Sequence, residues 1–178
     1  MTSVCPCELP ATSLLHKYRQ EGAYTDCYVA EVGGSVSQSA FIEAFYTTLL
    51  FKAERVILDW FAARPSSDIE ANRLAEGTSC SFAAWRVEGR TADQLLLADF
   101  TGRTRSWLMA APVGGTGLGM RTRLYFGSAV VARVDARTGR RKMGFAFHAL
   151  LGLHRLYSRL LLRAARSRVL TSRRAIAS

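Results

Sequence analysis

The stretch GFAFHALLGLHRLYSRLLLRAA, residues 144–165, is the most apolar run in the chain, yet it contains two histidines and three arginines. At about 100° per residue, the spacing of an α-helix, its leucines and arginines separate onto two faces. The apolar face comprises Leu150, Leu153, Tyr157, Leu160, Leu161 and Ala164, and the opposite face comprises His148, Arg155, Arg159, Arg163 and Arg166. The pattern predicts one long helix over residues 144–170, packed through its leucines.

The arginines within this stretch argue against a transmembrane span, because each would cost about 2.5–3.5 kcal/mol near the centre of a bilayer. We expect Arg155, Arg159 and Arg163 to form a solvated helix face. The alternative is a weak contact with an anionic surface, where each basic residue would contribute about 1 kcal/mol.

The formal net charge of +10 is concentrated at the C-terminal end of the chain. Residues 1–132 contain 12 Lys and Arg against 13 Asp and Glu, whereas residues 133–178 contain 12 basic residues and one acidic residue, Asp135. This distribution indicates a near-neutral globular body with a basic end. Because aromatic residues do not alternate with the basic ones as a stacking platform requires, we expect no specific nucleic-acid partner.

Length and composition predict one domain with a single substantial core, since the chain has 178 residues of which 49% are apolar. The first residues lack the basic and apolar regions of a secretory signal, so a cytoplasmic location is expected. Only Cys5 and Cys7 lie close together, and no second pair completes a zinc site, so we expect no metal and no other cofactor. Cys27 and Cys80 are expected to be small core residues.

The first half of the chain reads as a strand followed by helices. Residues 23–32, AYTDCYVAEV, alternate as a strand does, and Gly33 and Gly34 end the pattern. A capping box at Ser35 and Gln38 then predicts two helices with a bend near Thr47–Thr48, the second ending before Pro65. A further short helix is expected between the capping pair Ser67 and Glu70 and the C-terminal Gly77.

From residue 80 the hydrophobic period changes to two, which predicts four antiparallel strands at residues 80–89, 93–100, 104–112 and 122–134. The glycine-rich segment VGGTGLGM, residues 113–120, is expected to be a hairpin loop and not a phosphate-binding loop, because a strand follows it. The predicted domain spans residues 23–170, with an N-terminal extension at residues 1–22 and a frayed basic tail at residues 171–178.

This order predicts an α+β fold in which a curved antiparallel sheet packs one face against the long C-terminal helix, with two or three helices after the first strand. It is similar to the helix-grip fold of the START, polyketide-cyclase and birch-pollen-allergen superfamily. Several phrases also resemble an uncharacterised bacterial family that is associated with this superfamily: AFYTTLLFKAERVIL, FAAWRVEGR, GRTRSWL, TRLYFGSAV and LHRLYSRLL. The resemblance covers roughly residues 24–165 and implies a ligand-binding protein or an enzyme, without assigning catalytic roles.

Two residues are candidates for acid–base chemistry in a cavity between the sheet and the helix. Asp26 lies between Tyr24 and Tyr28 in the first strand, and it would need an Arg or His partner if it is buried. His154 lies at the flank of the apolar helix face, where it would line such a cavity or serve as a hydrogen-bonded structural residue.

The remaining candidates would bind the ligand, on the condition that they face the helix. Alternation places Arg105 and Trp107 on one side of a strand and Arg123 and Tyr125 on one side of the next, with Ser106, Leu108, Phe126 and Ser128 on the other sides. Sequence alone leaves open which sides face inward. The complete ligand-binding set is Trp85, Arg105, Trp107, Arg123, Tyr125 and Tyr157.

These observations favour binding of a small, largely apolar or aromatic molecule in an internal cavity between the sheet and the C-terminal helix. The first alternative is a cyclase- or dehydratase-type enzyme that acts on a polyketide-like or other carbonyl compound in the same cavity. Its proton carrier would be Asp26 or His154, with Arg105 or Arg123 stabilising an enolate and Tyr125 or Tyr157 orienting the substrate. The second alternative is binding of an anionic surface or nucleic acid through the basic end.

Overall fold

The protein is described by a computed structural model that covers residues 3–51, 67–114, 119–134, 141–142 and 145–177. Side chains are described for these residues except 133–134, 141–142, 145–150, 174 and 176–177. The elements are β1 (Cys5–Pro6), α1 (His16–Gln20), β2 (Tyr24–Gly33), α2 (Gln38–Tyr46), α4 (Asp68–Glu76), β3 (Ser81–Phe82), β4 (Trp85–Arg90), β5 (Gln94–Asp99), β6 (Thr104–Val113), β7 (Arg121–Val130), β8 (Arg133–Val134), β9 (Arg141–Lys142) and α5 (Phe145–Ala177). The α+β class is as expected.

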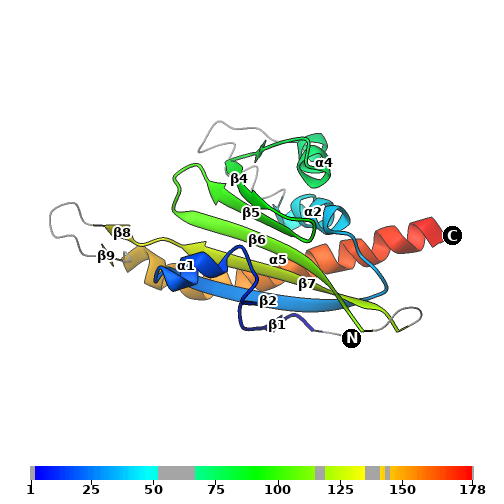
Figure 1. Cartoon of the computed structure of the whole chain (residues 1–178), viewed down its shortest axis with the longest axis horizontal. Coiled ribbons are helices and arrows are strands. Elements are labelled where there is room, and N and C mark those ends of the chain that lie inside the picture. Colours follow the sequence, from blue (N-terminus) through cyan, green and yellow to red (C-terminus); the bar gives the residue numbers. More distant parts are fainter. Residues whose placement is uncertain (1–2, 52–66, 115–118, 135–140, 143–144, 178) are drawn as a thin grey trace.

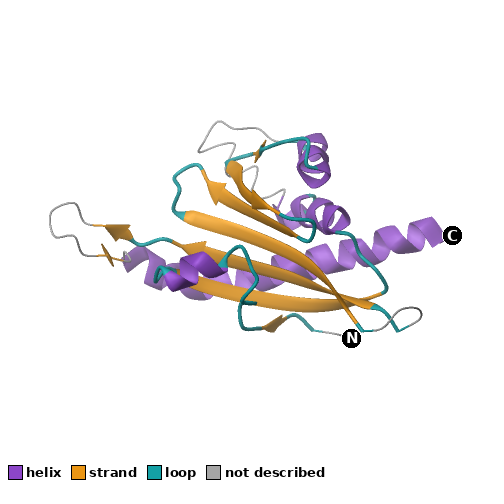
Figure 2. Ribbon diagram, in the orientation of Figure 1, coloured by secondary structure: helices purple, strands orange, loops and turns teal. Residues whose placement is uncertain are grey.

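The described strands β1 to β7 form an open seven-stranded sheet in the order β1-β2-β7-β6-β5-β4-β3, with every neighbouring pair antiparallel (Figure 2). After β2 the chain passes through helices to the far edge of the sheet. It then returns strand by strand until β7 pairs with β2 along its whole length, from Tyr24 opposite Val130 to Gly33 opposite Arg121. Strands β8 and β9 pair separately.

The sheet has a helix-covered face, against which α2 and α5 pack (Figure 1). Alternate residues of the central strands point to this face, and their apolar side chains form the larger core. In that core the ring of Phe45 on α2 lies 4.8 Å from the ring of Phe126 on β7. Two hydrogen bonds also hold α2 to β6: Gln38 Nε2 donates to the carbonyl of Leu108, and the hydroxyls of Tyr46 and Ser106 are 3.2 Å apart.

The N-terminal segment covers the opposite face of the sheet, where a second apolar cluster surrounds the fully buried Trp107. The side chain of Gln94 holds this segment in place, because its Oε1 accepts hydrogen bonds from Trp107 Nε1 and from the backbone N–H of Leu14, both at 2.9 Å. Its Nε2 donates to the carbonyl of Thr12. Both faces of the sheet are therefore covered. Residues 5–20, which we predicted to be part of an N-terminal extension outside the domain, are packed against it.

Most of the expected local signals are present. Ser67 and Glu70 form the capping box of α4, and Gly77 ends this helix in the left-handed conformation at φ 82°. Two expectations were wrong. The N-cap of α2 is Ser37, whose side chain accepts from Ala40 N, and not Ser35. Cys80, which we expected in the core together with Cys27, is exposed. The bend at Thr47–Thr48 is confirmed, with Thr48 Oγ1 accepting from Phe51 N, while residues 52–66 of the second expected helix lie outside the described residues.

Helix α5 differs from the expectation in rotation and in length. Its buried side chains are Ser158, Leu161, Leu162, Ala165 and Val169. Leu153 and Leu160, which we expected to be packed, are 64% and 43% exposed, while Leu150 lies outside the described side chains. The expectation was wrong because leucines occur nearly all around this helix, so periodicity alone did not determine which stripe meets the sheet. The helix also continues to Ala177 through the segment expected to fray.

Candidate functional site

Asp26, Ser128 and His154 come together between the sheet and α5. Asp26 on β2 and Ser128 on β7 are directly opposite each other in the sheet register. Both alternate with core residues of the helix-covered face, so both side chains lie on that face. His154 reaches them from the same side of α5 that buries Ser158, one helical turn further on. The two proton carriers predicted from the sequence are therefore neighbours in space.

Short polar contacts join the three side chains of this Asp–Ser–His cluster. Ser128 donates its hydroxyl proton to Asp26 Oδ1 over 2.6 Å, and its backbone N–H donates to the same oxygen over 3.1 Å. Ser128 Oγ also lies 2.9 Å from His154 Nε2. Because the single hydroxyl proton is assigned to the carboxylate, Oγ accepts there and Nε2 carries a proton. The serine is therefore not hydrogen-bonded to histidine as the nucleophile of a hydrolase triad would be.

Two polar atoms at the cluster have no hydrogen-bond partner among the described residues: Asp26 Oδ2, which lies 3.3 Å from His154 Nε2, and the hydroxyl of the fully buried Ser158. The side chain of Asp26 is 9% exposed and that of His154 is 30% exposed. Since buried polar groups are nearly always paired, these two atoms are candidates for binding a polar group of a ligand. The imidazole of His154 is the more exposed of the two side chains and connects the cluster with solvent.

The structure divides the predicted ligand-binding set between the two faces of the sheet. Trp85 and Tyr157 pack against the core of the helix-covered face, together with Asp26 and His154. Trp107 and Tyr125 belong to the opposite cluster, with ring centroids 6.2 Å apart, beneath the N-terminal segment. These two aromatic residues therefore do not line the space between the sheet and α5.

The two arginines of that set are engaged in ion pairs on the same side as Trp107. Arg105 Nε contacts Glu88 Oε2 at 2.6 Å and donates to the Tyr18 hydroxyl, so its carboxylate partner belongs to the protein itself. Arg123 Nε lies 2.8 Å from Glu31 Oε1 in an exposed cross-strand pair between β7 and β2. Both arginine side chains lie on the face of the sheet opposite the Asp–Ser–His cluster, although Arg105 pairs with Ala129, next to Ser128. The enolate-stabilising role predicted for them is not consistent with this placement.

Sequence reasoning missed Ser128 and Ser158 as members of the site. For Ser128 a signal was present, because its alternation with Phe126 placed it on the same side as apolar core residues. A serine in that position must find a hydrogen-bond partner within the core. Ser158 gave no comparable signal, since its burial depends on the rotation of α5.

The Glu88 carboxylate has a pKa below its ordinary value. Burial by itself would raise this pKa, but hydrogen bonds from Lys17 and Tyr18 and the charge of Arg105 lower it further than burial raises it. A carboxylate whose pKa is lowered by folding stabilises the protein above its unfolded pKa, and this contribution is lost as the pH falls through the folded pKa. The group joins α1 to β4 and β6, so its loss loosens the N-terminal segment.

We expect Glu88→Gln to lower the free energy of unfolding by about 1–2 kcal/mol near pH 7, because a charged acceptor of several hydrogen bonds is removed. The difference from wild type should shrink as the pH falls below the ordinary glutamate pKa of 4.5, where the carboxylate of the unfolded chain becomes protonated, and it should disappear below the lowered pKa of the folded protein. Urea denaturation at a series of pH values measures both quantities. Glu31→Gln is the control, since its ion pair is exposed, and a difference that stays constant with pH would contradict the assignment.

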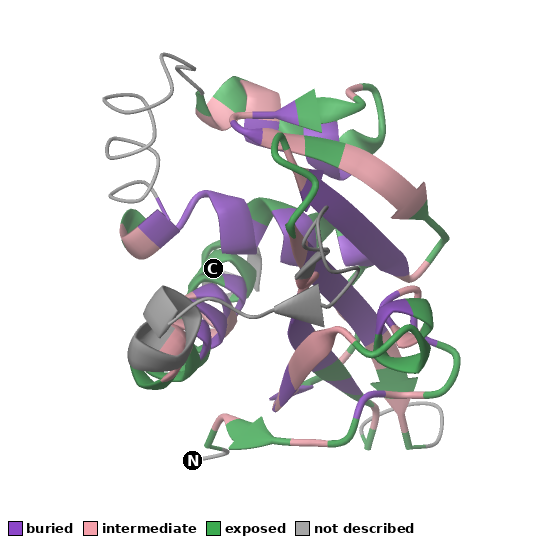
Figure 3. Ribbon diagram, turned by 90° about the vertical axis from the view of Figure 1, so that its left-hand side faces the viewer, coloured by how far each residue is buried: buried purple, intermediate pink, exposed green. Residues whose placement is uncertain are grey.

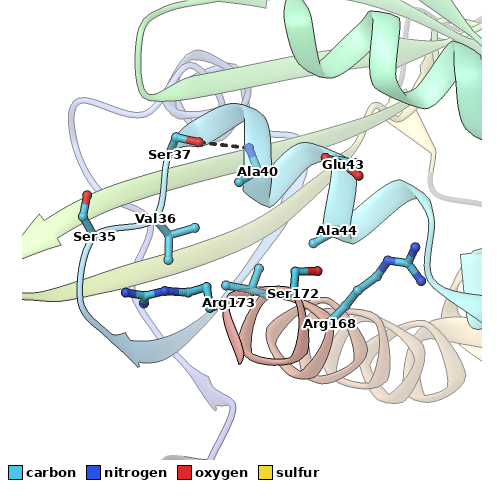
Figure 4. A pocket seen from close by; sticks show the side chains of 10 residues that line it. Ser35, Val36, Ser37, Ala40, Glu43, Ala44, Arg168, Ser172 and Arg173 are labelled. Atoms are coloured by element: carbon cyan, nitrogen blue, oxygen red, sulfur yellow. Dashed lines mark hydrogen bonds between the residues drawn. The ribbon is translucent and has the colours of Figure 1, made fainter. Parts of the chain in front are cut away.

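Four grooves at the surface are lined by described residues, and Asp26 lines none of these four. The groove in Figure 4, about 590 Å³, lies between the start of α2 and the last turns of α5, which contribute Arg168, Ser172 and Arg173 to its lining. Arg173 is already engaged there, because its Nη1 donates to the carbonyl of Gly33. Trp85 lines another groove, about 410 Å³, at the hairpin between β5 and β6.

No protein-family model matches the chain, and no curated protein sequence matches it either. Within the described part of the chain, no helix is both long enough and apolar enough to span a bilayer. The same residues contain no group of three His, Cys, Asp or Glu side chains placed to hold a metal ion.

Proposed function

We propose that the protein binds a small, largely apolar or aromatic molecule between its sheet and α5, and that the Asp–Ser–His cluster holds a polar group of this molecule. The main observation behind this proposal is that Asp26, Ser128 and His154, which belong to three separate elements, contact one another on the apolar face of the sheet. The strand order supports a helix-grip architecture, because the first long strand pairs with the last and one long helix crosses the sheet.

Two buried polar atoms of the cluster, Asp26 Oδ2 and Ser158 Oγ, make no hydrogen bond with the described residues and favour binding of a polar ligand group. Asp26 Oδ2 accepts no hydrogen bond from the described residues, although His154 Nε2 lies 3.3 Å away, and a ligand donor that reaches Oδ2 would complete its hydrogen bonding. The surroundings are apolar and aromatic, since Tyr28 follows Asp26 on the same face and Phe126 precedes Ser128. These neighbours favour a ligand with a hydrocarbon or aromatic body and one hydroxyl or amide donor.

A second candidate function, supported by the short distance between Asp26 and His154, is acid–base catalysis on a carbonyl compound. Dehydration or cyclisation needs a base that removes a proton next to the carbonyl and an acid that protonates the departing or developing oxygen. Asp26 Oδ2 would serve as the base and His154 Nε2–H as the acid, since the two atoms lie 3.3 Å apart. Tyr157, on the same side, would orient the substrate.

The binding proposal is tested by recording the imidazole ¹⁵N signals of the protein while adding phenols, aromatic amides and cyclic ketones. A ligand should shift the signals of His154 and leave those of His16 unchanged, because His16 lies on α1 at the opposite face. Asp26→Asn should weaken binding about 10- to 100-fold, the usual loss for a hydrogen bond to a charged group. Arg123→Gln, across the sheet, should bind as wild type does.

Two outcomes would contradict the binding proposal: equal affinity of wild type and Asp26→Asn for every bound compound, or ligand shifts confined to His16. The catalytic candidate needs turnover of a bound carbonyl compound that both Asp26→Asn and His154→Gln abolish. Binding without turnover would leave the protein as a binder. Turnover that survives in both variants would remove the acid–base mechanism while leaving the binding proposal testable by the ¹⁵N signals.

A further inference from the structure

The outward face of α5 carries three exposed leucines: the exposed fractions of Leu153, Leu156 and Leu160 are 64%, 54% and 43%. On a helix they fall within an arc of about 60°, opposite the buried stripe that meets the sheet. Figure 3 shows the buried residues of α5 turned toward the sheet and its exposed residues turned away from it. Three large apolar side chains in one exposed arc form an apolar patch, and larger patches of this kind are typical of surfaces that contact a protein or a membrane.

Positive charge borders this leucine arc. The sequence of α5 contains seven arginines and no acidic residue. Arg159 and Arg163 lie on one edge of the arc, one and two turns beyond Arg155, and both are exposed. With Arg166, they also line a groove of about 460 Å³ beside Leu156 and Leu160, which the N-terminal Ser3 and Val4 close on the other side.

We propose that the outward face of α5, comprising Leu153, Leu156, Leu160, Arg159 and Arg163, docks on the surface of an anionic lipid bilayer with the helix parallel to the membrane plane. The leucines enter the boundary between headgroups and acyl chains, while the arginines extend to the lipid phosphates. The Asp–Ser–His cluster lies between the inner side of α5 and the sheet, so docking of the outer side leaves the cluster in place. The proposal is independent of the function proposed for that cluster.

Charge complementarity selects this partner over a second copy of the chain. A symmetric contact through the leucine arc would place arginines of one α5 beside arginines of the other, without any acidic residue on either helix to compensate. A bilayer interface provides both negative charge for the arginines and an apolar phase for the leucines, since anionic phosphates lie directly above hydrocarbon. Nucleic acid meets the charge requirement alone, because the arc contains leucines and no aromatic ring on which a base stacks.

The test is sedimentation of the full chain with vesicles of phosphatidylcholine alone and of phosphatidylcholine mixed with phosphatidylglycerol. Wild type should bind the mixed vesicles and remain in solution with the neutral ones. Arg159→Gln/Arg163→Gln should reduce the partition coefficient about 30-fold, from about 1 kcal/mol for each basic residue. Leu153→Ser/Leu156→Ser/Leu160→Ser should reduce it at least about tenfold through lost apolar burial.

Matched controls separate the α5 face from charge and hydrophobicity in general. Arg73→Gln/Arg103→Gln removes the same charge from exposed arginines elsewhere, and Leu49→Ser/Ile69→Ser/Phe100→Ser removes three other exposed apolar side chains. Both controls should bind as wild type does. Each variant is first checked by thermal denaturation, and because the substituted side chains are exposed, all should remain folded.

Three results would overturn the proposal. The first is equal binding of the Leu→Ser triple variant and its control triple, which would mean that attraction is purely electrostatic. The second is equal binding to neutral vesicles. The third is a dimer in size-exclusion chromatography that the Leu153/Leu156/Leu160 variant converts to a monomer, because a second copy would then cover the arc. The two proposals can fail separately. If the protein does not bind vesicles but a small molecule still shifts the His154 signals, only the docking proposal fails. If it binds vesicles but no small molecule shifts those signals, only the proposal for the Asp–Ser–His cluster fails.

Discussion

Leu162→Ala should lower the free energy of unfolding by about 2–5 kcal/mol, the usual range for truncating a fully buried leucine. Leu162 is completely buried where α5 packs against the sheet and α2. The cavity left behind would be bordered by side chains already held in place by the aromatic cluster around Phe45 and Phe126. Urea denaturation followed by circular dichroism measures the change directly.

The matched control is Leu153→Ala, nine residues earlier on the same helix. Its side chain is 64% exposed, so the change should stay within about 0.5 kcal/mol of wild type. Leu153→Asp should also fold, whereas Leu162→Asp should not, because only the second buries an unpaired charge. If Leu153→Asp proves to be unfolded and Leu162→Ala harmless, the rotation of α5 described above is wrong.

Trp107→Ala should lower the free energy of unfolding by about 3–5 kcal/mol, since the largest fully buried side chain of the protein's described residues is removed. The substitution also leaves Gln94 without the indole N–H that helps to orient it, so the hydrogen bonds from Gln94 to Thr12 and Leu14 weaken. The N-terminal segment should then detach more often, which trypsin cleavage after the exposed Arg19 would report.

Trp107→Phe separates the two parts of this effect. It retains most of the apolar contact but removes the donor to Gln94, so we expect a loss of about 1–3 kcal/mol with faster cleavage at Arg19. Phe100→Ala is the aromatic control, because Phe100 is 61% exposed, and it should change neither stability nor cleavage appreciably. Rapid cleavage in wild type, unchanged by either tryptophan substitution, would show that the segment is not held by this contact.

The site at Asp26 was partly predictable. Its position between Tyr24 and Tyr28 in an alternating strand indicated an inward-facing carboxylate that would need a partner, and His154 was one of the residues considered for this cavity. That these two meet could not be derived, because they are 128 positions apart and their contact depends on the β2–β7 register and on the rotation of α5. The contacts of His154 with Ser128 and Asp26 help to hold α5 in this rotation.

Gly127 illustrates a requirement that no local pattern reveals. A Cβ atom at this position would lie 3.0 Å from the ring of Trp107 and 3.0 Å from the carbonyl oxygen of Asp26. The glycine therefore lets the indole pack flat on β7, next to the strand that carries the acidic residue. In the sequence it is simply a glycine in a strand, because the neighbouring strands that crowd it come from distant parts of the chain.

The sequence by itself determined the order of the main elements after residue 23, the antiparallel meander and the long basic C-terminal helix, because periodicity, capping residues and charge are local properties of the chain. It did not predict β1 and α1 in the N-terminal segment. The tertiary structure decided which faces are inside. Both sides of the sheet carry apolar residues and α5 carries leucines nearly all around, so local hydrophobicity could not distinguish the inner from the outer face. That choice depends on which partner each face meets: α2 and α5 on one side of the sheet, and the N-terminal segment held by Gln94 on the other.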